Sequence, residues 1–103
     1  MTWIPSIELI ETIFEEQLET RVEYINKNHL ESAIDILHFG FPFRKEPLSI
    51  FEQAAVLMRN IVQYHVFVDG CKRIGIHVSY VFLWKNGFMV KPSDPEEMFR
   101  FPM

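Results

Sequence analysis

The chain has 103 residues, 49% of them hydrophobic, with a formal net charge of -4 and a single cysteine, Cys71. This length predicts one domain, residues 1–103. The negative balance gives no electrostatic basis for direct nucleic-acid binding, and no segment has the roughly 18 uncharged apolar residues of a membrane span. One cysteine excludes an internal disulfide and favours a reducing compartment, so we expect a cytoplasmic protein without a membrane partner.

The first third of the chain predicts two helices separated by a loop. After Pro5-Ser6, apolar residues recur at helical spacing, at positions Ile7, Ile10, Ile13, Phe14 and Leu18. Residues 20–27 are of mixed character and are expected to form the loop. Asn28 is the expected cap of the second helix, because Glu31 follows three residues later as in a capping box.

A segment rich in phenylalanine and proline, FGFPFRKEP at residues 39–47, separates the second helix from the third. Its glycine and prolines forbid a continuous helix. Ser49 and Glu52 form a capping box, and the apolar spacing after them predicts a third helix that runs toward His65. The phenylalanines of this segment could simply fill the core, and this interpretation stays open for Phe39 and Phe41.

The last part of the chain predicts a fourth helix over residues 71–84, which Asn86-Gly87 would stop. A short extended piece could follow from Phe88, and Pro95 could begin one last turn. All four long elements read as helices, so we expect an all-α domain. Two of its helices flank the stretch HVFVDGCKRIG at residues 65–75.

This stretch brings an imidazole, a carboxylate, a thiol and two cations to the start of a helix. A helix N-terminus offers unpaired N–H groups and a partial positive charge, which together favour an anion such as phosphate. Lys72 and Arg73 oppose the helix dipole there, so a bound anion would explain them. His65 could then act as a base and Asp69 could hold magnesium, while Phe67 would anchor the loop in the core.

Structural interpretations of the same residues stay open at this point. Asp69 could only cap the fourth helix, and His65 could only interact with the C-terminal dipole of the third. Lys72 and Arg73 could be solvated, and Cys71 could be a small half-buried residue. No paired cysteines and no His-x-x-x-His spacing favour a zinc site.

The stretch resembles the signature of the Fic/Doc family, His-Pro-Phe-x-(Asp/Glu)-Gly-Asn-(Gly/Lys)-Arg, in a loop between two helices. Residues 65–73 read HVFVDGCKR in its place. The segments NHLESAIDI, FEQAAVLMRNIVQYH and VSYVFLWKNG also resemble the family, so that the likeness covers roughly residues 6–90. It implies a compact helical domain with a short flap segment that docks the target. The flap is expected at residues 39–47, with Phe43, Arg44 and Lys45.

Lysine at the position of Lys72 resembles the Doc toxins, whereas Fic enzymes have glycine there and usually transfer AMP. The resemblance implies transfer of the terminal phosphate of ATP, with Mg²⁺, to a Ser/Thr hydroxyl of a protein such as the translation factor elongation factor Tu. By position, His65 would be the catalytic base, Asp69 the magnesium ligand, and Gly70, Cys71, Lys72 and Arg73 the phosphate-binding residues. A separate antitoxin chain would control the enzyme.

Three departures from the family pattern bear on these expectations. Val66 replaces the proline of the signature, and Cys71 replaces its asparagine, whose amide would help to hold the phosphates. A thiol is a weak donor, so catalysis could be reduced. The chain also ends at Met103, where the family usually continues with a further helix; a partner or a second copy could cover the exposed face. The alternatives are therefore a catalytically weakened binding module and a protein AMP-transferase.

Overall fold

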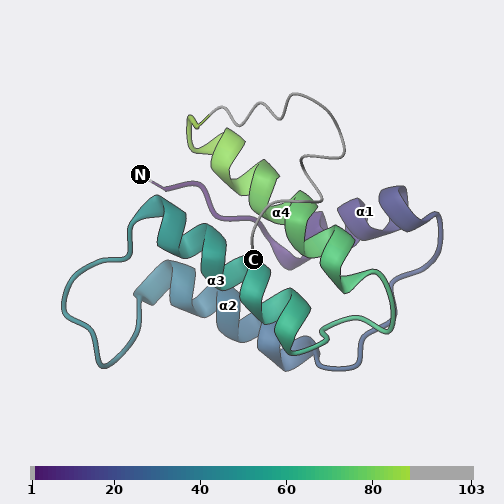
Figure 1. The fold of residues 1–103 in the computed structure, drawn as a ribbon, viewed down its shortest axis with the longest axis horizontal. Coiled ribbons are helices and arrows are strands. Elements are labelled where there is room, and N and C mark those ends of the chain that lie inside the picture. Colours follow the sequence, from purple (N-terminus) through teal and green to yellow (C-terminus); the bar gives the residue numbers. More distant parts are fainter. Residues whose placement is uncertain (1, 89–103) are drawn as a thin grey trace.

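The structure, a computed structural model, describes residues 2–88, which form four helices. These are α1 (Ile7–Leu18), α2 (Lys27–Phe39), α3 (Ile50–Gln63) and α4 (Cys71–Lys85). Helices α2 and α3 run antiparallel side by side, α3 also packs against α4, and α4 packs against α1 (Figure 1). Residues 2–88 contain no β-strand, and the prediction of an all-α domain is confirmed.

Local capping signals set the ends of three helices as predicted. Ser6 accepts a hydrogen bond from the Leu9 amide and begins α1. The capping box of Ser49 and Glu52 is present at the start of α3, with hydrogen bonds of 3.1 and 2.9 Å. Asn86 ends α4. The turn expected at Pro95 lies outside the described residues, and no helix within residues 2–88 is long and apolar enough to cross a membrane.

The start of α2 differs from the prediction. The N-cap is Asn26, so Asn28 lies inside the first turn and caps nothing. Asn26 makes no side-chain cap hydrogen bond either. Its amide instead donates to the carbonyl oxygens of Tyr64 and His65, 38 and 39 residues further along the chain. The residue before α2 is therefore held by a long-range contact, and no local capping pattern in the sequence marks it as a helix start.

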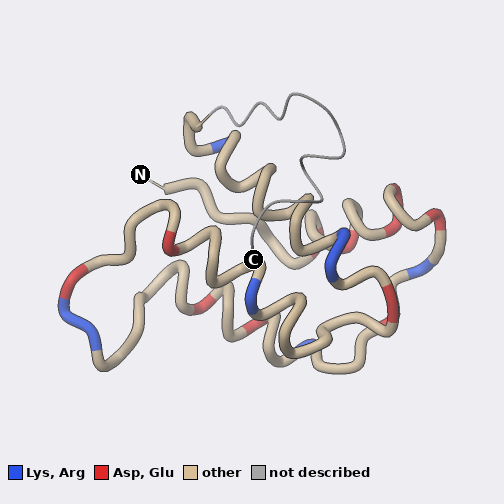
Figure 2. Tube along the Cα trace, viewed as in Figure 1, with Lys and Arg blue, Asp and Glu red and all other residues tan. Residues whose placement is uncertain are grey.

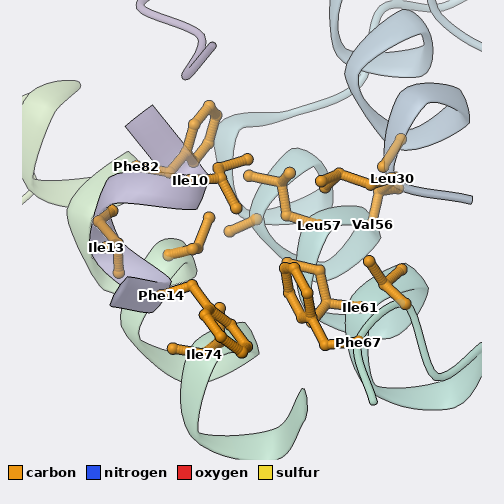
Figure 3. Close-up of a cluster of buried hydrophobic side chains, with 14 of the residues drawn as sticks. Ile10, Ile13, Phe14, Leu30, Val56, Leu57, Ile61, Phe67, Ile74 and Phe82 are labelled. Atoms are coloured by element: carbon orange, nitrogen blue, oxygen red, sulfur yellow. The ribbon is translucent and has the colours of Figure 1, made fainter. Parts of the chain in front are cut away.

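The hydrophobic core lies between the four helices and also takes in the loop before α4. Phe67 is 1% exposed and packs against Phe14, with ring centroids 4.7 Å apart. Figure 3 shows Phe67 beside Ile61 in this cluster, with side chains from α1 and α4 around it. The loop that carries the motif is thus anchored by its own aromatic residue.

Segment 39–47 joins α2 to α3 and is mostly exposed. Phe39 and Phe43 are 85% and 82% exposed, so the interpretation of Phe39 as a core residue is wrong. Phe41 packs against the core and stacks on Phe43, with centroids 5.1 Å apart. Arg44 forms a bidentate pair with Glu52, with N–O distances of 2.7 and 3.2 Å, which ties the segment to the first turn of α3.

The Arg44 pair makes a prediction for the pH dependence of stability. Its hydrogen bonds lower the pKa of Glu52 to about 2, with a further contribution from the Ser49 amide. A folded-state pKa below the unfolded one means that the contribution to stability is complete above the unfolded value and is lost as the pH falls toward 2. Glu52→Gln keeps the capping box but removes the charge, so we expect a lower urea midpoint than wild type at pH 7.

That difference in urea midpoint should shrink as the pH is lowered from about 4.5 toward 2. Glu46→Gln is the matched control, because Glu46 is 3.8 Å from Arg44 and its side chain is 80% exposed. We expect Glu46→Gln to change the midpoint little at any pH. A Glu52→Gln midpoint that stays below wild type by the same margin at pH 2 and pH 7 would contradict the ion-pair explanation.

Candidate functional site

A pocket of about 520 Å³ opens at the start of α4. Basic residues lie on the first turn of this helix, next to an acidic residue of the preceding loop (Figure 2). Every residue that the motif predicted as a site residue lines this pocket. Two further apolar residues, Ile25 and Val68, line it as well. The lining consists of Ile25, His65, Phe67, Val68, Asp69, Gly70, Cys71, Lys72 and Arg73.

His65 lies just beyond the C-terminal end of α3 and has an exposed imidazole. Its φ of 48° is in the left-handed region, which residues other than glycine seldom adopt. This conformation ends the helical path and directs the chain into the core, where Val66 and Phe67 are buried. The backbone turn at His65 thus leaves its imidazole at the pocket, while the buried side chains of Val66 and Phe67 anchor the loop.

The motif loop pairs with the segment between α1 and α2. The amides of Ile25 and Asn26 donate to the Val66 carbonyl at 2.8 and 3.1 Å, and the Val68 amide donates to Glu23 at 3.0 Å. The Tyr24 ring stacks on Phe67 at 5.3 Å. Residues 22–26, which lie within the segment predicted as a loop, therefore form an extended edge beside the pocket, paired on one side with the motif loop.

A signal for this edge is present in the sequence VEYIN. Val22 and Tyr24 are partly buried and packed on the core, while Glu23 and Ile25 are exposed. Such alternation is typical of a half-buried extended segment. It spans only a few residues, so it did not stand out between two helices. Ile25 and Val68, both more than half exposed, are the pocket residues that sequence reasoning missed.

The carboxylate of Asp69 does not cap α4. Its Oδ1 accepts a hydrogen bond of 2.8 Å from the Gly70 amide, and Gly70 is the N-cap residue, with no side-chain cap on the helix. The first N–H groups of a helix have no partner within it, so the first turn of α4 keeps its donors for a ligand. The Gly70 amide itself is occupied, which leaves the later amides as the anion-binding donors.

Gly70 is favoured by its backbone conformation and by a close neighbour. Its φ is 73°, and a Cβ at this position would collide with Leu18 Cδ1 of α1. The missing side chain therefore leaves room for Leu18, while the residue also lines the pocket. The start of α4 is held against the end of α1 by this close approach.

Gly70→Ala is expected to destabilise the domain. The left-handed conformation costs about 1–2 kcal/mol for a residue with a Cβ, and the Leu18 side chain must also shift to admit the methyl group, which adds a smaller loss. Gly87→Ala is the matched control, because Gly87 has a φ of 92° but nothing within 4 Å of the added Cβ. Urea unfolding should show the larger loss for Gly70→Ala. Equal losses for both variants would contradict the packing explanation.

Cys71 interacts with the loop. Its thiol is 3.2 Å from the Phe67 carbonyl oxygen, to which it donates a hydrogen bond, and the residue packs against the core. A weak donor thus stands at the position where the family signature has an amide. A side-chain contact to an anion at this end of the helix would have to come from the neighbouring residues.

Lys72 and Arg73 are exposed, and no carboxylate of residues 2–88 lies within ion-pair distance of either. Two cations that no described carboxylate pairs with, on the first turn of a helix, concentrate positive charge there. Arg73 also acts on His77 one turn later: burial and the Arg73 charge lower the pKa of His77. The pocket can therefore bind an anion of more than one negative charge.

Segment 39–47 does not border this pocket. It precedes α3, whereas the motif follows α3, and a helix of 14 residues separates its ends by roughly 20 Å. Figure 1 shows the two loops at opposite ends of the α2–α3 pair. Phe43, Arg44 and Lys45 are absent from the pocket lining, so the segment expected as the flap lies away from the pocket and its docking role stays a prediction. The extended segment beside the pocket is residues 22–26.

The donor set fits magnesium bound together with phosphate better than a protein-only metal site. No group of three or more metal-ligating side chains occurs within residues 2–88. Mg²⁺ is often held by one or two carboxylates and the phosphates of its substrate, with water completing the shell. Asp69, exposed at the pocket beside two cations, can supply that single carboxylate.

Comparison with known proteins agrees with the geometry of the site. The model of a family described as Fic/DOC matches residues 6–83, which include the motif, α3, most of α4 and the 22–26 edge. The comparisons with curated proteins and with solved structures gave no match. The family match covers well over half of the chain, and the chain belongs to the Fic/DOC family.

Proposed function

We propose that this protein transfers the terminal phosphate of ATP to a Ser or Thr hydroxyl of a protein, as Doc-type toxins do. Members of the Fic/DOC family are commonly protein-modifying transferases and typically use ATP with Mg²⁺. The observation that carries the finer proposal is Lys72. It lies exposed at the pocket, next to Arg73 and across the loop from His65, and no carboxylate of residues 2–88 pairs with it.

The residues of the pocket can divide the chemistry of this transfer. His65 would take the proton of the acceptor hydroxyl as its oxygen bonds to the terminal phosphorus and the bond to the bridging oxygen breaks, with ADP leaving. Lys72, Arg73 and the first-turn amides of α4 would hold the phosphate oxygens. Asp69 would hold Mg²⁺, which neutralises phosphate charge when bound.

Lys72 also argues against AMP transfer. The inner phosphates of a nucleotide need the space beside the helix start that glycine leaves in Fic enzymes, and a lysine side chain fills it. Cys71 favours the second candidate, a binding module of the same fold without chemistry. Its thiol is engaged with Phe67, so no amide contacts a phosphate there.

Labelled ATP distinguishes these functions. The purified chain, Mg²⁺ and a cell extract are incubated with ATP labelled in the terminal or the innermost phosphate. Phosphate transfer predicts protein-bound label from the terminal position only, whereas AMP transfer predicts it from the innermost position. If no protein carries label from either phosphate position, at enzyme concentrations that bind Mg-ATP, the binding module is favoured.

We further infer that the acceptor protein docks on residues 22–26. The Ile25 amide donates to the Val66 carbonyl and the Glu23 carbonyl accepts from the Val68 amide, which leaves the N–H and C=O of Tyr24 on the opposite edge. A free extended edge can pair with the backbone of a peptide. The acceptor would be a cytoplasmic translation factor such as elongation factor Tu, and a separate antitoxin or a second copy of the chain would cover the site.

Ile25→Ala tests this docking edge. Ile25 is 58% exposed at the rim of the pocket, so the change should leave folding intact while it removes an apolar contact without adding charge. We expect about 10-fold weaker acceptor modification, since an interface anchor contributes about 1–2 kcal/mol, and unchanged Mg-ATP binding. Phe43→Ala is the control, because Phe43 is exposed at the far end of α3. A loss confined to Phe43→Ala would restore segment 39–47 as the docking site.

A further inference from the structure

The side-chain amide of Asn26 holds the end of α3 and the backbone of His65 at once. Its Nδ2 donates to the Tyr64 carbonyl at 2.7 Å and to the His65 carbonyl at 3.3 Å. These contacts join the N-cap residue of α2 to residues that lie 38 and 39 positions further along the chain. The side chain of Asn26 makes no hydrogen bond to its own helix, although Asn26 occupies the N-cap and its backbone carbonyl accepts from the His29 amide at 3.1 Å.

Two features make these carbonyls the ones that need a partner. The last carbonyls of a helix have no acceptor role within it, and Tyr64 and His65 follow directly after α3. His65 is also in the left-handed region at φ 48°, a conformation that persists only where surrounding contacts enforce it. A single NH₂ group can reach both oxygens only while the chain keeps this turn.

The neighbours of Asn26 hold it rigidly in place. Its backbone amide donates to the Val66 carbonyl at 3.1 Å, on the other side of His65. One turn along, the His29 ring stacks on Tyr64 with centroids 4.2 Å apart, and buried Asn60 donates to the His29 carbonyl at 2.9 Å. The start of α2 is therefore fixed to the end of α3 on both sides of the amide.

We propose that Asn26 is a positioning residue for His65: it fixes the backbone from which the imidazole reaches the pocket. This inference rests on the proposed function, in which His65 is the base. A base must lie within hydrogen-bond reach of the acceptor hydroxyl, and a displacement of about 1 Å can cost about 100-fold in rate. Asn26 touches no reacting atom and acts through His65 alone.

Asn26→Asp separates this role from a role in helix stability. Aspartate is at least as good an N-cap as asparagine, so α2 should lose nothing, but a carboxylate cannot donate to the two carbonyls. Asn28→Asp is the matched control, with the same change of charge at the start of α2, at an exposed residue whose side chain makes no hydrogen bond within residues 2–88. We expect kcat to fall about 10- to 100-fold in Asn26→Asp only, with the KM for ATP unchanged.

A double variant shows whether the effect passes through His65. Asn26→Asp should add no further loss to His65→Ala, since there is no base left to position. An additional loss of about 10-fold in the double variant would overturn the proposal, as would a kcat of Asn26→Asp equal to that of Asn28→Asp. If His65→Ala leaves transfer unchanged, the proposed function itself has failed, and the backbone measurement below decides the structural role of Asn26.

NMR of the full chain measures the turn without any activity. A strong intraresidue HN–Hα contact at His65 reports its positive φ in the wild type. We expect this contact to weaken in Asn26→Asp and to persist in Asn28→Asp. If it persists in both, Asn26 does not hold His65, and the proposal is overturned whether or not the protein transfers phosphate.

Discussion

Replacing His65 with alanine is expected to lower phosphate transfer by about 10²–10⁴-fold, the usual contribution of a general base. The exposed imidazole lines the pocket, and the groups that would bind the phosphates belong to other residues, Lys72 and Arg73. Binding of Mg-ATP should therefore survive the substitution. Measuring transfer of terminal phosphate label beside Mg-ATP affinity by calorimetry would separate the two effects.

His77→Gln is the matched control for this prediction. His77 lies on the same helix as the phosphate contacts but outside the pocket lining. Because burial and the Arg73 charge lower the pKa of His77, its ring is uncharged at neutral pH, and glutamine replaces it without a change of charge. A transfer rate in His65→Ala equal to that of His77→Gln and wild type would refute the role of His65 as base.

The helices could be predicted from the sequence because their signals are local. Ser6 before α1, the box of Ser49 and Glu52 before α3, and Asn86 after α4 each act within four residues of a helix end. Apolar spacing then identified the buried faces. The motif loop was predictable for the same reason, since residues 65–73 contain both its chemistry and its anchor, Phe67.

The surroundings of the site were not predictable, because they depend on contacts between distant segments. Pairing of residues 22–26 with the motif loop joins positions about forty apart, and nothing near Asn26 indicates that its amide serves Tyr64. The resemblance to the family places the flap at residues 39–47, but this segment is an exposed connection at the end of α3 away from the pocket. The edge that lies beside the pocket, residues 22–26, has a less distinctive composition.

Gly70 and Cys71 show how packing gives a motif residue contacts that its position in the sequence does not reveal. Both lie at the pocket as the motif required. Gly70, however, makes room for Leu18, and Cys71 donates to the Phe67 carbonyl. Sequence position fixes where such residues lie along the helix, but the direction of a side chain depends on the packing of α1 and the loop. Their roles could only be derived from the folded chain.

Replacing Cys71 with asparagine is expected to raise phosphate transfer by about 10²–10³-fold, which is the usual contribution of one preorganised donor to a transferring group. The thiol now donates to Phe67 at 3.2 Å. An amide has two N–H groups, so Asn at this position can keep the hydrogen bond to the loop with one and offer the other to a phosphate. The measurement is the initial rate of terminal-phosphate transfer at saturating ATP.

Cys71→Ser distinguishes the phosphate contact from a better loop contact. A hydroxyl donates to the Phe67 carbonyl more strongly than a thiol but has only one hydrogen, which that carbonyl already uses. If the gain comes from a new phosphate donor, Cys71→Asn rises and Cys71→Ser stays near wild type. Equal gains would mean that the loop, held by Phe67 and Cys71, limits the rate. If neither variant transfers phosphate faster than wild type while Mg-ATP still binds, the binding module is favoured. The asparagine of the signature would then be present at position 71 without any catalysis.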